Sequence, residues 1–229
     1  MHNHILPGLD DGSPDVETSL QLTEGLLELG YQKIISTPHI LSDLYPNNPV
    51  TIAAAHKILI PEVRKLHEGY ESKFAAEYMI DFEFEDLLRK REILSFGNDK
   101  YVLIEMSYLM ESPNLRNVIF GLLTTGYLPV LAHPERYGYL HYKFSDYELI
   151  RDAGCDLQVN ILSLIGYYGG DSQKIAEKLI DQGLISWVGT DMHHHNHLNA
   201  LRKLATNKRA LKYLAKIKNL KNPVLLQNF

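Results

Sequence analysis

Short runs of apolar and β-branched residues alternate with amphipathic helical segments, and this alternation constrains the fold more than any other feature of the sequence. Turn-sized connections join the segments, which is typical of a parallel sheet covered by helices. The candidate strands are 2–4, 33–36, 74–76, 101–104, 128–132, 156–160 and 185–189. The candidate helices are 16–29, 51–67, 82–91, 114–125, 145–153, 172–182 and 199–217. About seven strands predict an α/β fold with a closed or nearly closed barrel.

Composition excludes several classes of protein. The 229 residues, of which 45% are hydrophobic and 22% charged, suit one globular domain that spans 1–229. A net charge of -5 argues against a nucleic-acid-coating surface. Neither a run of 18 apolar residues nor a basic and apolar leader segment occurs, so we expect no membrane span and a cytoplasmic location. The single cysteine, Cys155, fits a reducing compartment.

Imidazole and carboxylate groups recur where the predicted strands end. His2 and His4 form an H-x-H pair whose side chains project from one side of an extended strand. A turn-rich loop then brings Asp10 and Asp11 back towards them. The other groups at or just past the carboxyl ends of predicted strands are His39, Glu77, Glu105, His133, Asp191 and His193. In a barrel these ends share one face, so the repeated placement predicts a metal site.

The donor set narrows the choice of metal. Imidazole and carboxylate ligands without a thiolate suit manganese, iron or zinc better than magnesium or copper(I). Arg136 lies three residues after His133 and offers a bidentate fork for phosphate, with a surface ion pair to Glu135 as the alternative. Cys155 lacks the following arginine-containing loop of a cysteine-nucleophile phosphatase, so we assign it to the core.

Further histidines follow the last strand. His194, His195 and His197 could contact the ligands or a substrate, but a solvated polar loop is the favoured interpretation.

Six motifs, in order, resemble those of the polymerase-and-histidinol-phosphatase (PHP) superfamily. They are H-x-H-I-L-P-G-x-D-D-G, T-P-H, A-E-Y, I-E-M-S, A-H-P-E-R and T-D-M-H. More narrowly, the chain resembles the bacterial manganese-dependent protein-tyrosine phosphatases of capsular and extracellular polysaccharide synthesis. This resemblance implies a distorted seven-stranded β/α (TIM-like) barrel of PHP type with three metal ions. The matching positions are His2, His4, Asp11, His39, Glu77, Glu105, His133, Asp191 and His193.

The resemblance also implies a mechanism. Three divalent ions would exceed the charge of their four carboxylates and so attract phosphate, in spite of the acidic chain. Glu105 can bridge two ions, and a water held between metals becomes hydroxide near neutral pH. That hydroxide would attack phosphorus while Arg136 neutralises the developing charge.

Two positions depart from the pattern of the superfamily. Relatives usually have a first strand before H-x-H, whereas only Met1 precedes His2 here. We therefore expect a truncated first strand or a sequence that begins inside a longer natural chain. Relatives also tend to carry a second arginine after the last metal histidine, and Arg202 is the candidate to replace it.

The sequence thus predicts a metal-dependent phosphomonoesterase that acts on a phosphotyrosine protein. A tyrosine kinase of polysaccharide synthesis is the expected partner. One alternative is a small-molecule phosphatase that acts on histidinol phosphate or a nucleotide. Another is a catalytically silent metal-binding scaffold that docks a kinase or polymerase.

Overall fold

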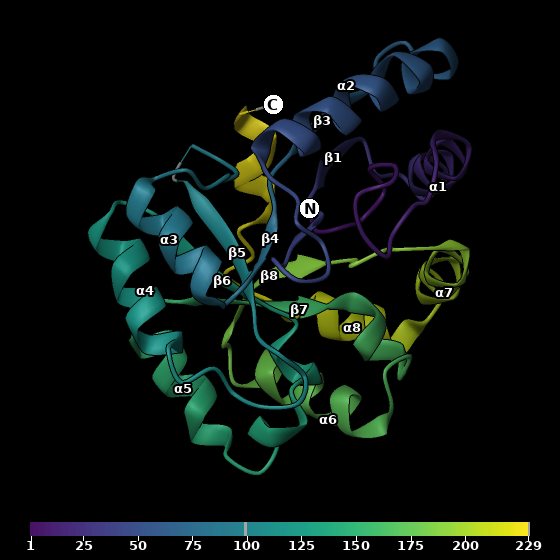
Figure 1. Ribbon diagram of the computed structural model, residues 1–229. Helices are drawn as coiled ribbons and strands as arrows, with labels where there is room; N and C mark the ends of the chain where they lie inside the picture. The colour runs from purple at the N-terminus through teal and green to yellow at the C-terminus, as the bar shows by residue number, and fades with distance from the viewer. Residues whose placement is uncertain (99, 229) are drawn as a thin grey trace.

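The computed structural model describes residues 1–98 and 100–228 of the chain (Figure 1). Its strands are β1 (Lys33–Ser36), β2 (His39–Ile40), β3 (Glu71–Phe74), β4 (Glu77–Met79), β5 (Tyr101–Glu105), β6 (Leu128–Ala132), β7 (Asp156–Asn160) and β8 (Ile185–Gly189). Its α-helices are α1 (Val16–Glu28), α2 (Pro49–Leu66), α3 (Phe82–Lys90), α4 (Leu115–Thr124), α5 (Phe144–Asp152), α6 (Gly170–Asp181), α7 (His195–Leu204) and α8 (Lys208–Leu214). Short 3-10 helices are η1 (Pro134–Arg136), η2 (Gly138–Leu140), η3 (Ile161–Ile165) and η4 (Asn222–Asn228).

The strands form two parallel sheets. Within the described residues, β1 pairs with β3, and the other six strands are arranged in the order β2-β4-β5-β6-β7-β8. The alternation of strands and helices and the parallel pairing agree with the expectation from the sequence. A closed barrel of seven strands does not, because these eight strands lie in two sheets and neither sheet closes.

Two breaks in the strands explain this division. β1 and β2 are separated by Thr37 and Pro38, and Pro38 has no N–H to donate to a neighbouring strand. The N–H of Thr37 donates to Asn3 O at 2.9 Å. A matching interruption at residues 75–76 separates β3 from β4, so the single strand expected at 74–76 is wrong. Both breaks come directly before the next strand, and β2 and β4 begin with His39 and Glu77 in register.

The segment around the H-x-H pair is also not a regular strand. Asn3 forms an isolated parallel bridge with Met192, and His2 has a left-handed φ of 64°. A strand over residues 2–4 was therefore the wrong expectation. The long final helix expected at 199–217 is likewise divided into α7 and α8, because the side chain of Asn207 caps a new helix by accepting the N–H of Ala210.

Alternate residues of β5 face two apolar layers. Val102 and Ile104 belong to the main core, against which the helices pack, whereas Tyr101 and Leu103 belong to a smaller cluster on the opposite face of the sheet. Helices α3, α4, α5 and α6 lie outside the strands (Figure 1). Glu105, the last residue of β5, lies on the same face of the sheet as Tyr101 and Leu103, because side chains alternate along a strand. Its carboxylate therefore lies next to the smaller cluster, at the carboxyl end of β5.

None of the helices in the described part of the chain is long and apolar enough to cross a membrane.

Candidate metal centre

The nine candidate ligands converge in one cluster. They come from the N-terminal segment, from the starts of β2 and β4, from the end of β5, and from the loops after β6 and β8. Three groups have donor atoms that all lie within 4.8 Å of one another. These groups are His2, His4, Glu77 and Asp191; His4, Asp11, His39 and His193; and His39, Glu77 and Glu105.

Glu77 lies at the centre of the cluster. Its Oε2 is 3.1 Å from His2 Nε2, 3.2 Å from His4 Nε2 and 3.3 Å from His39 Nδ1. Its other oxygen, Oε1, is 3.0 Å from His133 Nε2, which places the ninth residue at the edge of the cluster. Neighbouring ligands on an ion with bonds of about 2.1 Å are separated by about 3 Å. The spacing around Glu77 is compatible with ligands of a common cation, and at these distances Glu77 also forms hydrogen bonds with His2 and His133.

Several of these buried atoms have no hydrogen-bond partner. They are His4 Nε2, His39 Nδ1 and Asp191 Oδ1. His39 Nδ1 lies 2.8 Å from Glu105 Oε1, yet the two groups lack the alignment of a hydrogen bond. Buried polar atoms rarely remain unpaired, because each costs about 1–3 kcal/mol. Donor atoms that face one another without hydrogen bonds fit a centre that takes metal ions.

The backbone is strained at the same place. His2, His133 and Asp191 have φ values of 64°, 35° and 48°, in the left-handed region that residues other than glycine rarely adopt. Hydrogen bonds hold two of them together, since the N–H of Asp191 donates to His2 O at 3.0 Å. Such strain persists at sites where the surrounding structure over-determines it.

Imidazoles and carboxylates shift each other's pKa values across the cluster. Burial alone lowers the pKa of His2, but the Glu77 and Asp191 carboxylates outweigh it and raise that pKa to about 10. Burial likewise opposes protonation of His39, and the carboxylates, Glu105 foremost, raise its pKa to about 9. Against the effect of burial, the imidazoles hold the pKa values of Glu77 and Asp191 well below their usual range. Without metal, His2 and His39 are therefore protonated at neutral pH.

Asp10 orients the cluster from behind, a role that the sequence analysis did not assign to it. Its Oδ2 lies 2.7 Å from His4 Nδ1 and accepts the backbone N–H of His39 at 2.9 Å. Its Oδ1 accepts the N–H of Gly12 at 3.0 Å. A side chain at Gly12 would collide with His4 O, so this glycine lets the loop close on the histidine. A carboxylate at the remote nitrogen of a ligand histidine fixes the ring and raises its basicity.

Arg136 lies beside the cluster. Its Nη1 donates to Asp191 Oδ2 at 2.7 Å, and its guanidinium carbon is 4.0 Å from the ring centre of Tyr168 and 4.6 Å from that of Tyr108. Glu135, the alternative partner, is fully buried, and its Oε1 accepts hydrogen bonds from Asn160 N and Ser163 Oγ. A pocket of about 160 Å³ opens here and is lined by Asp11, Arg136, Tyr168, Asp191, His193, His194 and His197.

A solvated loop was expected for His194, His195 and His197. The structure differs from this expectation at His197. His197 is 8% exposed, and its Nδ1 accepts the backbone N–H of His193 at 3.1 Å. Burial, with the neighbouring His194 and His193, lowers the pKa of His197 to about 4. Neutral His197 therefore carries its proton on Nε2. His195 is exposed, as expected, and its Nε2 contacts Gln21 Oε1 at 2.9 Å.

Within the described part of the chain, Arg202 and Cys155 make their hydrogen bonds to residues outside the ligand cluster. The guanidinium of Arg202 donates to Glu28 Oε2 at 2.8 Å and to Asn199 Oδ1 at 3.3 Å, on the outer side of α7. Cys155 is fully buried, and burial raises the pKa of its thiol. The assignment of Cys155 to the core is confirmed by this burial.

The profile of the family described as "Capsular polysaccharide synthesis, CpsB/CapC" matches residues 1–224. The chain belongs to the CpsB/CapC family. Among its curated relatives, tyrosine-protein phosphatase YwqE of Bacillus subtilis is 32% identical over 200 residues, which are 85% of this chain and 76% of YwqE. The putative tyrosine-protein phosphatase CapC of Staphylococcus aureus is 30% identical over 216 residues, which are 93% of this chain and 83% of CapC.

A solved structure extends the likeness of this CpsB/CapC chain to three dimensions. It belongs to a study of YwqE from Bacillus subtilis and CpsB from Streptococcus pneumoniae, described as metal-dependent tyrosine phosphatases. The TM-score is 0.79 with 27% identity, and the match covers 96% of this chain and 94% of the other. The resemblance to tyrosine phosphatases of polysaccharide synthesis is thereby confirmed, and the solved relative is described as metal-dependent. Manganese stays a prediction.

Proposed function

We propose that the protein is a metal-dependent protein-tyrosine phosphatase of polysaccharide synthesis. The observation that carries the proposal is the meeting of three ligand groups, two of which share Glu77, with unpartnered donor atoms, directly beside an arginine. Membership of the CpsB/CapC family and the printed names of its relatives support the substrate class. A tyrosine kinase of polysaccharide synthesis is the proposed phosphoprotein, and the cytoplasm stays the predicted location.

The nine residues assigned from the sequence are the proposed ligands. They are His2, His4, Asp11, His39, Glu77, Glu105, His133, Asp191 and His193. Nitrogen and oxygen donors without sulfur suit manganese, iron or zinc, and the resemblance to the manganese-dependent phosphatases favours manganese among these. Bound divalent ions would supply positive charge for the phosphoryl oxygens and would lower the pKa of a coordinated water.

The chain itself supplies orientation and charge. The two carboxylate oxygens of Asp191 have different partners. Oδ2 accepts hydrogen bonds from Arg136 and Asn160, whereas Oδ1 lies 3.2 Å from His2 Nε2 and 3.4 Å from His4 Nε2. Arg136 is thereby fixed next to the ligands. It offers further N–H groups in a planar fork that matches phosphate. A tyrosine leaving group, whose parent pKa is about 10, needs less protonation than an alkoxide, so an obligatory acid from the protein is less pressing.

The test is phosphate release from a phosphotyrosine peptide by chelator-stripped protein, with and without manganese. We expect manganese to restore turnover, and we expect phosphotyrosine to be preferred over histidinol phosphate and a nucleotide. His39→Ala should lose metal and turnover together, whereas His195→Ala, a histidine on the exposed start of α7, should retain both. Folded protein that takes up metal but does not hydrolyse phosphotyrosine would refute the assignment.

A further inference from the structure

Exposed apolar side chains line the loops next to the metal centre. Phe82 lies at the start of α3, Tyr108, Leu109 and Met110 follow β5, and Tyr142 lies after η2 in the connection between β6 and α5. We call these five residues the apolar rim. Leu109 is 92% and Met110 67% exposed, which is unusual for contiguous apolar side chains in a loop. Contiguous exposed apolar groups commonly mark an interaction site.

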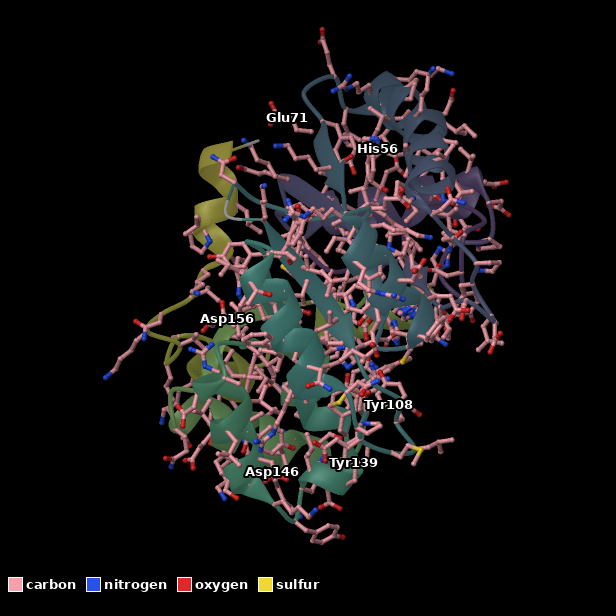
Figure 2. The ribbon with its side chains drawn as sticks, turned by 60° about the vertical axis from the view of Figure 1, so that its left-hand side comes forward. His56, Glu71, Tyr108, Tyr139, Asp146 and Asp156 are labelled. Carbon is pink, nitrogen blue, oxygen red and sulfur yellow. The ribbon has the colours of Figure 1, made fainter. Side chains whose placement is uncertain are left out.

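Hydrogen bonds join the loops that carry the rim. Strands β4, β5 and β6 are neighbours in the larger sheet, so the loops that follow them are neighbours too. The hydroxyl of Tyr139 donates to Ser107 O at 3.0 Å, which joins the loop after β6 to the loop after β5. Asn114 Nδ2 donates to Glu85 Oε1 at 2.6 Å and joins that second loop to α3. Figure 2 shows Tyr108 and Tyr139 at the same end of the molecule.

The rim leads directly into the candidate site. The ring of Tyr108 has its centre 5.7 Å from that of His133 and 4.6 Å from the guanidinium carbon of Arg136. Leu109 and Met110 follow Tyr108 in the chain and lie further out in solvent. A phosphoryl group beside Arg136 would therefore place the neighbouring residues of its own chain over the rim.

The charges of these loops select among possible occupants. Residues 80–83, 106–114 and 137–144 include three acidic residues, Asp81, Glu83 and Glu111, and one lysine, Lys143, so the net charge of these segments is negative. Glu83 and Glu111 are exposed. This charge disfavours acidic segments and anionic membrane surfaces and favours a partner that carries lysine or arginine.

We propose that the apolar rim binds the residues that flank phosphotyrosine in an extended peptide, and that it selects apolar flanks accompanied by basic residues. Leucine, methionine and aromatic side chains suit this task, because they adapt to varied apolar partners. This inference rests on the proposed phosphatase activity and adds the substrate class to it.

Three phosphotyrosine peptides and p-nitrophenyl phosphate, assayed with manganese-loaded protein, test the rim. One peptide has leucine and phenylalanine flanks with a nearby lysine, the second has serine flanks, and the third has glutamate flanks. We expect kcat/KM to fall in that order, chiefly through KM. The small aryl phosphate reports on the centre alone, because it has no flanking residues.

The variant Leu109→Ser/Met110→Ser should lower kcat/KM for the apolar peptide about tenfold, because two apolar side chains no longer become buried on binding. Activity towards p-nitrophenyl phosphate should not change. The matched control is Phe120→Ser/Leu149→Ser, which removes two exposed apolar side chains from the outer surfaces of α4 and α5. The control should retain the preference of the unaltered protein.

Equal kcat/KM for the three peptides, with p-nitrophenyl phosphate still hydrolysed, would overturn the rim and leave the phosphatase standing. Loss of the apolar preference in the control variant would also overturn it. Failure to hydrolyse any of the four substrates with metal bound would remove the phosphatase and the rim together. Sedimentation with vesicles of phosphatidylcholine and phosphatidylglycerol tests whether the rim binds a membrane instead. If the protein binds these vesicles through Leu109 and Met110 and shows no preference among the peptides, membrane binding would replace our proposal.

Discussion

Replacement of Asp10 by asparagine should weaken metal binding without removing a ligand. The buried Asp10 carboxylate accepts from three groups, His4 Nδ1, His39 N and Gly12 N, at 2.7, 2.9 and 3.0 Å. An amide has one oxygen and one NH₂ group, so it cannot accept on both sides. If the NH₂ faces Gly12, two donors oppose each other. If the NH₂ group faces His4 instead, His4 Nδ1 must accept a hydrogen bond, so the proton of the ring moves to Nε2. This is the nitrogen that faces Glu77 and would bind the metal.

Either arrangement has a cost that can be estimated. One buried donor without a partner costs about 1–3 kcal/mol. Loss of a group that orients a metal ligand typically lowers metal affinity by about 10- to 100-fold. We therefore expect Asp10→Asn to raise the manganese dissociation constant by about 10- to 100-fold, while turnover at saturating manganese is retained because all nine candidate ligands remain.

Manganese affinity is measured by competition with a fluorescent chelator, and turnover by phosphate release across a manganese titration. Asp43→Asn is the matched control, because it makes the same change of charge on an exposed loop at the same end of the molecule. Unchanged manganese affinity in Asp10→Asn would refute the reasoning. An equal loss in Asp43→Asn would show that net charge, rather than orientation of His4, sets the affinity.

Three other changes test the centre. Arg136→Lys keeps the charge but loses the planar fork, so kcat/KM for phosphotyrosine should fall about 10²- to 10³-fold while bound metal, measured by elemental analysis, is retained. Cys155→Ala should keep full activity in the phosphate-release assay and cost about 1 kcal/mol in the free energy of unfolding, because the thiol is buried in the core. Metal binding at pH 7 should release protons, because His2 and His39, with pKa values of about 10 and about 9, are protonated below those values and must give up the proton to bind a cation. Calorimetry in two buffers of different ionisation enthalpy counts the protons, and an equal heat in both would contradict the last expectation.

The sequence was informative where one physical cause dominates. Strands β6, β7 and β8 lie at the residues expected, because each is a short segment that is bounded by turns and largely buried; β6 and β8 are mainly apolar, and β7 alternates polar residues with leucine and valine. The donors predicted at strand ends also come together, because Glu105, His133, Asp191 and His193 lie at or past the carboxyl ends of parallel strands. His39 and Glu77 join them from the starts of β2 and β4, just after the breaks that end β1 and β3. Both inferences use only local pattern and the geometry of a parallel sheet.

The features that could not be predicted from the sequence depend on hydrogen bonds between residues that are far apart in the chain. The break at Thr37 depends on a hydrogen bond to Asn3, and apolar periodicity carries no trace of it. The side-chain partner of Arg136 is Asp191, 55 positions away, whereas the sequence analysis named the adjacent Glu135 as the alternative to a phosphate role. Asp10 stood in the same motif as Asp11, and the rule that ligand histidines have carboxylate partners could have identified it.

The cluster combines three unfavourable features, which are buried charges, unpartnered donor atoms and left-handed backbone, and Asp191 has all three. His2 and Asp191 have the strained backbone and are also members of one ligand group. Their conformation is set by contacts away from the donor atoms, since Thr190 Oγ1 donates to His2 O at 2.8 Å and Asn160 Nδ2 to Asp191 Oδ2 at 3.1 Å. The surrounding hydrogen bonds therefore hold the donors in place independently of any ion. A cation that enters finds its ligands already oriented, so its binding energy is not consumed in ordering them.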